Sequence, residues 1–222
     1  MSRVLVTGAA GFIARHLIPR LRADGHEIVD AGRGCGDVAD PATWRRFPAA
    51  AVVVHLAAKS FVPESWHVPG VFMRTNLLGT LEALDYCRAH GARLVFPSSY
   101  LYGDVLRQPI AESTTLAAKN PYALSKKLAE EACEFYADRY DVPTTVLRPF
   151  NIYGPGQTDT FLIPTILNQL EAGKEIHVKD LEPRRDFVYV ADVVEAMVNA
   201  VARTGASACS MSVPGRATRC PS

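Results

Sequence analysis

Tyr122 and Lys126 are the two side chains of this sequence best suited to joint proton transfer. They are four residues apart, so a helix that contains both places them on one face. A free phenol has a pKa near 10, and a tyrosine that acts as a base near pH 7 needs a pKa about three units lower. An adjacent ammonium and a helix N-terminus both lower it. The pair therefore predicts acid–base chemistry, although packing and solvation alone also explain such a common spacing.

A glycine-rich turn near the start of the chain has the spacing of a nucleotide-binding site. Gly8 and Gly11 follow a short apolar run and come just before a helical pattern that begins at Phe12. Gly8 permits a tight turn, and Gly11 lets backbone N–H groups approach a pyrophosphate at the positive end of the helix. The turn predicts a dinucleotide site formed by Gly8, Gly11, Phe12 and Ile13, with Ala14 where many such sites have a third glycine.

The elements that must position these residues alternate between buried strands and amphipathic helices. This alternation predicts an α/β fold of the Rossmann type, with a doubly wound parallel sheet and helices on both faces. Asn120 as N-cap and Pro121 at the first helical position mark the start of the helix that carries Tyr122. The expected strands are Arg3–Thr7, His26–Ala31, Ala51–Ala57, Arg93–Ser98 and Thr144–Arg148, and the expected helices are Phe12–Ala23, Gly70–Ala89, Pro121–Tyr140 and one that begins near Asp192.

Two regions of unequal size are expected along the chain. Residues 1–150 form the dinucleotide-binding domain, and residues 151–222 form a small, incomplete substrate lobe interleaved with the last sheet elements. An apolar helix begins at Phe161–Pro164 and either lines the substrate pocket or belongs to the core. The stretch Ala206–Ser222 is small, polar and contains proline and glycine, so we expect a loose end there.

Composition excludes several classes of protein. The 222 residues carry 24 Lys+Arg against 23 Asp+Glu, which gives no concentrated positive charge for nucleic acid or an anionic membrane surface. No apolar stretch is long enough to cross a bilayer, and no signal peptide is recognisable. The five cysteines are scattered without metal-ligand spacing, which indicates reduced thiols and a cytoplasmic protein without a structural metal.

Further motifs appear downstream of the glycine turn in a characteristic order. Together they resemble the extended short-chain dehydrogenase/reductase family, which contains nucleotide-sugar epimerases, dehydratases and 4-keto reductases. The resemblance covers residues 3 to about 200. The matching residues are Asp37-Val38, His55-Leu56-Ala57-Ala58, Asn76 before Gly79-Thr80, Ser98-Ser99 with Tyr102-Gly103, Tyr122 with Lys126, Arg148 through Gly156, and Arg185-Asp186-Phe187.

The resemblance implies a catalytic set made of Ser98, Tyr122 and Lys126. Tyr122 exchanges a proton with a sugar oxygen, Lys126 holds the cofactor ribose and lowers the phenol pKa, and Ser98 hydrogen-bonds the reacting oxygen. Ser98 is chosen because it stands four residues before Tyr102, and Ser99 is its substitute. Successive strand side chains face opposite ways, so only one of the two serines reaches the site unless the strand has already ended.

The resemblance also implies the remaining cofactor contacts. Spacing from Gly8 places the ribose-selective position at Gly32, followed by Arg33, and an arginine there accommodates the 2′-phosphate of NADP. Asp30 is the alternative, because a carboxylate near the end of the second strand favours NAD. The sequence therefore favours NADP slightly over NAD. Adenine and nicotinamide contacts are expected from Asp37, Val38, Leu56, Ala57, Ala58 and Asn76.

On the substrate side, Ser99, Asn151 and Arg185 match positions that bind the sugar and diphosphate of a nucleotide sugar in relatives. A guanidinium can hold phosphate through two hydrogen bonds, although an ion pair is the alternative for Arg185. Dehydratases of the family add a carboxylate just after the active-site serine or threonine. Here Ser99 and Tyr100 follow Ser98, which disfavours dehydration.

The leading function is therefore NAD(P)-dependent redox chemistry at a hexose carbon, with C4 favoured, of a nucleotide sugar. An epimerase and a 4-keto reductase remain alternatives, and so does a non-catalytic dinucleotide sensor or inactive relative. Relatives usually run longer and complete the substrate lobe. Apolar surface left uncovered is expected to favour a homodimer.

Overall fold

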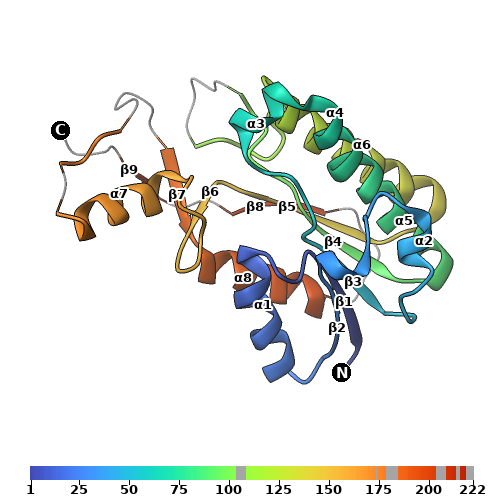
Figure 1. The fold of residues 1–222 in the computed structure, drawn as a ribbon. Coiled ribbons are helices and arrows are strands. Elements are labelled where there is room, and N and C mark those ends of the chain that lie inside the picture. The colour runs from blue at the N-terminus through green and yellow to red at the C-terminus, as the bar shows by residue number, and fades with distance from the viewer. Residues whose placement is uncertain (104–108, 174, 179–184, 204–208, 214–215, 219–222) are drawn as a thin grey trace.

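The computed structural model describes residues 1–103, 109–173, 175–178, 185–203, 209–213 and 216–218. Its centre is a six-stranded sheet in the order β2-β1-β3-β4-β5-β8, and every neighbouring pair is parallel. The parallel α/β sheet of the Rossmann type that the sequence predicts is thereby confirmed (Figure 1). The strands are β1 (Arg3–Thr7), β2 (Glu27–Ala31), β3 (Val52–His55), β4 (Arg93–Pro97), β5 (Thr144–Pro149) and β8 (Cys209–Val213).

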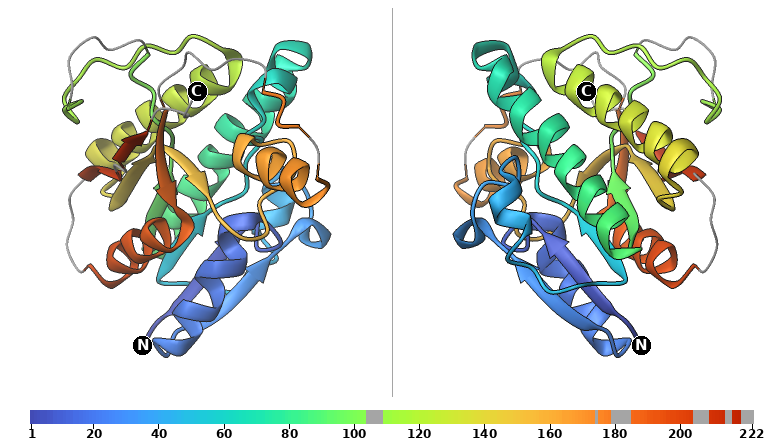
Figure 2. Two further views of the ribbon diagram at one scale, coloured as in Figure 1. Left: turned by 90° about the vertical axis from the view of Figure 1, so that its left-hand side faces the viewer. Right: turned by 90° about the vertical axis from the view of Figure 1, so that its right-hand side faces the viewer.

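Helices cover both faces of this sheet, as the side views show (Figure 2). On one face, α1 (Phe12–Ala23) and α8 (Val190–Ala202) pack against the side chains of Val4 and Val6. On the other face, α5 (Gly79–His90) and α6 (Pro121–Tyr140) pack against Leu5. Because successive residues of β1 point to opposite faces, its three central residues, Val4, Leu5 and Val6, are all apolar and buried.

Four short helical elements lie on the loops between these units. They are a 3₁₀ turn η1 (Arg33–Cys35), α2 (Pro41–Trp44), α3 (Val62–His67) and α4 (Pro69–Phe72). The helix expected over Gly70–Ala89 is interrupted, because α4 leads into a π-helical segment η2 (Met73–Leu78) before α5 begins. This interruption corrects the prediction of one continuous helix.

A second, three-stranded sheet stands beside the first. It consists of β6 (Asn151–Tyr153), β7 (Arg185–Tyr189) and β9 (Arg216–Thr218), and α7 (Leu162–Glu171) lies near it (Figure 1). The expectation of a loose end over Ala206–Ser222 is wrong for its described residues: β8 pairs with β5, and β9 pairs antiparallel with β7. The rest of that stretch lies outside the described residues. Whether residues 151–222 form a lobe separate from residues 1–150 stays a prediction.

The elements that carry the site residues have bounds close to those that the sequence predicts. The helices predicted at Phe12–Ala23 and Pro121–Tyr140 have those bounds, and Asn120 caps α6 by accepting a 2.8 Å hydrogen bond from the Ala123 N–H. Strand β3 ends at His55, two residues before the predicted end, and β4 ends at Pro97, one residue early.

No helix in the described part of the chain is both long and apolar enough to span a bilayer.

Candidate active site

The glycine turn after β1 forms a cradle closed on one side by the end of β3. Gly8 has φ +65°, and a Cβ placed on it would lie 2.7 Å from the Ala57 backbone nitrogen. The Gly11 N–H donates to the Gly8 carbonyl at 2.8 Å, and Gly11 then caps α1. A side chain at Gly8 would therefore collide with backbone, whereas the first N–H groups of α1 face the turn. These features fit a pyrophosphate.

The backbone of Leu56, Ala57 and Ala58 continues past the end of β3 beside this turn. The Ala57 N–H donates to Thr7 Oγ1 at 3.2 Å, so a side chain of β1 holds it. This hydrogen bond accounts for the early end of β3, because the Ala57 amide is bound by a hydroxyl instead of by a neighbouring strand. The three residues stand where the sequence predicted cofactor contacts, and those contacts stay predictions.

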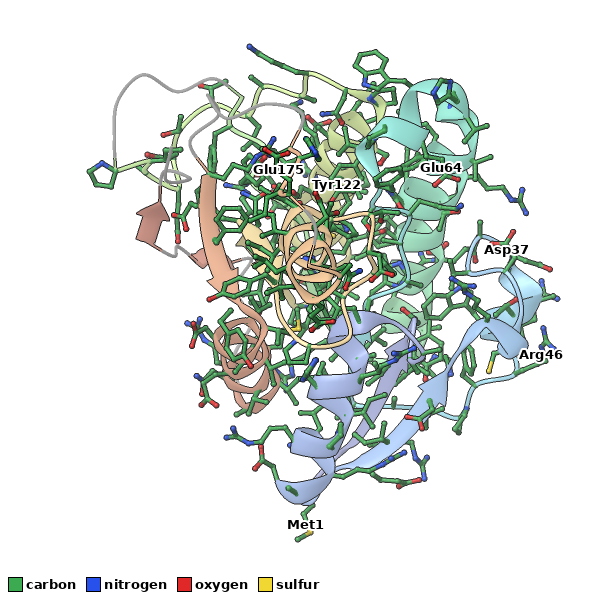
Figure 3. All side chains as sticks on the ribbon, turned by 60° about the vertical axis from the view of Figure 1, so that its left-hand side comes forward. Met1, Asp37, Arg46, Glu64, Tyr122 and Glu175 are labelled. Atoms are coloured by element: carbon green, nitrogen blue, oxygen red, sulfur yellow. The ribbon has the colours of Figure 1, made fainter. Side chains whose placement is uncertain are left out.

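The loop with Asp37 and Val38 is fixed against η2 and the start of α5. The Asp37 carboxylate accepts from the Ala39 N–H at 2.9 Å and pairs with Arg74 at 3.0 Å. The Ala39 N–H, together with Arg74, holds the pKa of Asp37 below its usual value although burial acts the other way. Val38 packs against Gly79, where a Cβ would lie 2.8 Å from the valine side chain. In Figure 3, Asp37 lies near the rim of the molecule, whereas Tyr122 lies toward its middle.

The end of β2 bears on the choice between the two dinucleotides. Gly32 precedes η1, and the side chain of Arg33 is exposed to solvent. The carboxylate of Asp30, the predicted NAD-selective alternative, pairs with Arg22 of α1 at 2.8 Å. The one acidic group considered for the ribose hydroxyls therefore already has a cationic partner.

Tyr122 lies in the first turn of α6, and the side chain of Ser99 lies beside its phenol. The ring of Phe72 meets it edge to face at a centroid distance of 6.5 Å. Burial raises the pKa of Tyr122 above its usual value, the Ser99 hydroxyl lowers it, and the nearby Tyr100 raises it. In the free protein the phenol is thus protonated at neutral pH and able to donate a proton, and the lowered pKa predicted from Lys126 and the helix N-terminus is not found.

Ser98 and Ser99 have different surroundings. The Ser98 N–H donates to the Leu147 carbonyl at 2.7 Å, and its hydroxyl is buried without a hydrogen-bond partner in the described part of the chain. The sequence predicted that Ser98 supplies the site hydroxyl and that Ser99 is the substitute. The structure places the Ser99 side chain beside the phenol, and it leaves the buried Ser98 hydroxyl without a partner among the described residues.

Lys126 follows one helical turn after Tyr122, and its amine lies beneath the carboxyl end of β4. The Nζ atom donates to the Pro97 carbonyl at 2.6 Å and stands 4.1 Å from the centroid of the Phe96 ring. Burial lowers the pKa of Lys126 to about 8, against the opposing charges of Cys133 and Glu130. The amine therefore carries its proton at neutral pH and loses it in mildly alkaline solution.

Asn76 connects the loop after β3 with the helix that carries Tyr122. Its carboxamide oxygen accepts from the Lys59 N–H at 2.8 Å, and its nitrogen donates to the Lys59 carbonyl and to Ser125 Oγ. Ser125 in turn donates to the Tyr122 carbonyl at 2.7 Å. Asn76 was predicted as a cofactor contact, and its described hydrogen bonds all go to protein. Its place in the π-helical segment is typical of functional positions.

A buried ion pair that the sequence analysis did not single out anchors the loop after β4. Arg148 Nη2 lies 2.6 Å from Glu130 Oε2, with the two side chains only 11% and 7% exposed. The same guanidinium donates to the Tyr102 hydroxyl at 3.2 Å and to the Glu112 carbonyl at 3.1 Å. Burial opposes the charge, but Glu130 and Tyr102 raise the pKa of Arg148. The signal available in the sequence was that Glu130 follows Lys126 by four residues on one helix face.

The predicted substrate residues Asn151 and Arg185 both lie in the second sheet. The Asn151 carboxamide donates to the Asp186 carbonyl at 2.9 Å and joins β6 to β7, whereas the Arg185 side chain is exposed at the start of β7. The Tyr100 and Phe150 rings stack 5.3 Å apart. The structure thus brings Ser98, Ser99, Tyr122 and Lys126 together. It leaves the roles of Asn151 and Arg185 as predictions.

Comparison with known proteins supports this arrangement. A model of the "NAD dependent epimerase/dehydratase family" matches residues 4–210. The chain is 33% identical over 232 residues to GDP-6-deoxy-D-mannose reductase of Pseudomonas aeruginosa, a match that covers 93% of this chain and 72% of the relative. The structure of RMD from Pseudomonas aeruginosa complexed with NADPH aligns with TM-score 0.88 and 31% identity, over 99% of this chain and 80% of that one.

A UDP-glucose 4-epimerase from Thermotoga maritima, solved with UDP-glucose, aligns with TM-score 0.90 and 29% identity over 97% of this chain and 78% of that one. The structural match therefore extends to enzymes with different names and ligands. On the family match and the similarity to the reductase, the chain belongs to the NAD dependent epimerase/dehydratase family, the extended short-chain dehydrogenase/reductases that use NAD(P) and act on nucleotide sugars.

Proposed function

We propose that this protein catalyses NAD(P)-dependent redox chemistry at a hexose carbon, C4, of a nucleotide sugar. The observation that carries the proposal is the position of the Ser99 side chain beside the Tyr122 phenol, at the carboxyl edge of the sheet that also holds the Gly8 turn. A bound nicotinamide supplies hydride exchange at the sugar carbon. The chain's own residues then have to move one proton at the oxygen of that carbon.

Tyr122 is the group proposed to move this proton. A raised pKa keeps the phenol protonated, as an acid that protonates a reduced carbonyl oxygen must be. Ser98 is proposed to orient that oxygen, because its buried hydroxyl has no hydrogen-bond partner among the described residues. Lys126, buried and protonated at neutral pH, is proposed to hold the cofactor ribose and to add positive potential near the phenol.

NADP is the proposed cofactor. The exposed Arg33 follows Gly32 at the end of β2, where a guanidinium can bind a 2′-phosphate. The Asp30 carboxylate, which would favour NAD, is paired with Arg22 at 2.8 Å. Residues Gly8, Gly11, Phe12 and Ile13 are proposed to bind the pyrophosphate, and Asp37, Val38, Leu56, Ala57, Ala58 and Asn76 to border the rest of the dinucleotide.

Use of NADP favours reduction of a 4-keto sugar nucleotide over epimerisation. A reductase consumes one NADPH for each product molecule, whereas an epimerase returns its cofactor to the starting state. Dehydration is disfavoured because neither Ser99 nor Tyr100, which follow Ser98, carries a carboxylate. Ser99, Asn151 and Arg185 are proposed to contact the sugar and diphosphate.

The experiment that tests the proposal counts cofactor against product. Purified protein is mixed with NADPH and a panel of 4-keto sugar nucleotides, and NADPH absorbance is compared with product formed. One equivalent of NADPH per product supports the reductase. Product without net NADPH consumption would assign an epimerase instead, and tight dinucleotide binding without turnover on any sugar nucleotide would favour the non-catalytic sensor.

A further inference from the structure

A buried histidine beneath the phosphate-binding turn has no part in the chemistry proposed above. His55 ends β3, and its Nδ1 lies 2.9 Å from Oγ1 of Thr7, its register partner at the end of β1. That hydroxyl also accepts the hydrogen bond from the Ala57 N–H. The rings of Trp44 and Phe96 flank the imidazole, at centroid distances of 5.9 and 6.4 Å. One hydroxyl therefore joins the histidine to the backbone beside the turn.

Counting the donors and acceptors of Thr7 and His55 shows which of the two side chains donates in their hydrogen bond. Burial, with the charge of Lys126 as a second cause, lowers the pKa of His55 to about 3, so the ring is neutral near pH 7. His55 Nε2 is buried without a hydrogen-bond partner in the described part of the protein. If Thr7 donates its one hydrogen to Nδ1, then of these groups only Nε2–H lacks a partner among the described residues.

The opposite direction leaves more groups unsatisfied. If Nδ1–H donated to Thr7, the threonine hydrogen and the Nε2 lone pair would both lack partners among the described residues. Because each unsatisfied buried polar group costs free energy, the hydroxyl donates to His55. The lone pairs of the hydroxyl are then free to accept from the Ala57 N–H.

Ala57 is the point at which this contact meets the phosphate-binding turn. A Cβ on Gly8 would lie 2.7 Å from the Ala57 nitrogen, so the two backbones are in direct contact. We propose that His55 is a positioning residue: it orients the Thr7 hydroxyl, which holds the Ala57 amide and thereby sets the backbone of Leu56–Ala58 against the Gly8 turn. The inference rests on the proposed function only in taking a dinucleotide as the bound group.

Two matched pairs of variants test this inference. Thr7→Val removes the hydroxyl but keeps the side-chain shape, and Thr7→Ser keeps the hydroxyl. His55→Leu removes the ring and its acceptor, whereas His55→Asn removes the ring but retains an acceptor near the position of Nδ1. For each protein, NMR measures hydrogen exchange of the Ala57 amide without ligand, titration gives Kd for NADPH and NADH, and thermal unfolding gives Tm.

The expected result separates positioning from packing. Thr7→Val and His55→Leu speed exchange of the Ala57 amide by at least about fivefold and raise Kd roughly three- to tenfold, as loss of one hydrogen bond predicts. Thr7→Ser and His55→Asn stay within about twofold of the unmodified protein in both measurements. Because His55 acts through Thr7, the double variant Thr7→Val/His55→Leu binds no more weakly than the weaker single variant.

Two outcomes would overturn the inference. In one, Tm falls in Thr7→Val and His55→Leu while Ala57 exchange and Kd stay unchanged, so His55 only packs. In the other, the two effects on Kd multiply in the double variant, so His55 does not act through Thr7. If His55→Leu does not fold, the threonine pair and His55→Asn decide the question. An unmodified chain that binds neither dinucleotide refutes the proposed function, and Ala57 exchange in the ligand-free variants still decides this inference.

Discussion

The side-chain hydroxyl of Ser99 lies beside the Tyr122 phenol and lowers its pKa against the opposing effect of burial. Ser98, the preceding residue, keeps a buried hydroxyl without a partner in the described structure. The two neighbouring serines thus have different surroundings, so the roles proposed for them can be tested separately.

Replacing each serine by alanine distinguishes these roles. Ser98→Ala is expected to lower kcat by about a hundredfold, as the loss of one oriented donor to a reacting oxygen does, with little effect on NADPH affinity. Ser99→Ala removes the hydroxyl that lowers the pKa of Tyr122. The pH at which the rate changes with ionisation of the phenol therefore moves upward. Profiles of kcat against pH for both variants provide the measurement, and a shifted profile in Ser98→Ala alone would reverse the assignment.

Arg33→Ala tests the choice of dinucleotide. Loss of a charged hydrogen bond to the 2′-phosphate is expected to raise Kd for NADPH by at least about tenfold and to leave Kd for NADH within about twofold. Arg45→Ala, also at an exposed arginine, is the control. Equal weakening of both dinucleotides by Arg33→Ala would remove the basis for proposing NADP.

Glu130→Gln tests the buried ion pair under the loop after β4. Leaving the Arg148 charge without its carboxylate partner is expected to lower the free energy of unfolding by about 3 kcal/mol. Glu131→Gln is the matched control, because Glu131 pairs with Lys127 at the surface and such pairs contribute less than about 1 kcal/mol. Denaturation by urea measures the free energy of unfolding of both variants. Equal losses in the two would show that the buried Arg148–Glu130 pair stabilises the fold no more than the surface pair does.

Acid titration of stability tests the burial of His55. The pKa of His55 is about 3 in the folded chain, whereas an ordinary histidine has 6.5. Between these two pH values the unfolded chain therefore binds a proton at His55 that the folded chain does not bind. Stability therefore falls as pH decreases from 6.5 toward 3, by up to about 1.4 kcal/mol per pH unit from this group. His55→Asn should lose this component, whereas His177→Asn, at an exposed histidine, should keep it. If the free energy of unfolding falls equally steeply with decreasing pH in His55→Asn and in the unmodified chain, the assignment to His55 is contradicted.

Local signals were enough to predict the helices that frame the site. The helices α1 and α6 have their predicted bounds, because a glycine turn fixes the start of one and Asn120-Pro121 fixes the start of the other. In contrast, β8 and β9 were missed because their hydrogen bonds go to strands far away in sequence. A small, polar segment carries no local sign of such pairing.

The sequence predicted which residues lie at the site better than it predicted how those residues contact one another. The choice between Ser98 and Ser99 relied on the alternation of side chains along a strand, but β4 ends at Pro97 and the rule no longer applies beyond it. Likewise, the hydrogen bonds of Asn76 depend on Lys59 and Ser125, which only the fold brings together. A homodimer and a cytoplasmic location remain predictions.

The most direct test of the account is turnover by Tyr122→Phe, compared with Tyr140→Phe at the exposed end of the same helix. With NADPH and an accepted 4-keto sugar nucleotide, Tyr122→Phe is expected to lose activity by about a thousandfold, since proton transfer contributes roughly 10²–10⁴. Its Kd for NADPH should stay within about threefold, and Tyr140→Phe should keep full activity. Full turnover by Tyr122→Phe with normal NADPH binding would contradict the central claim that this phenol transfers the proton.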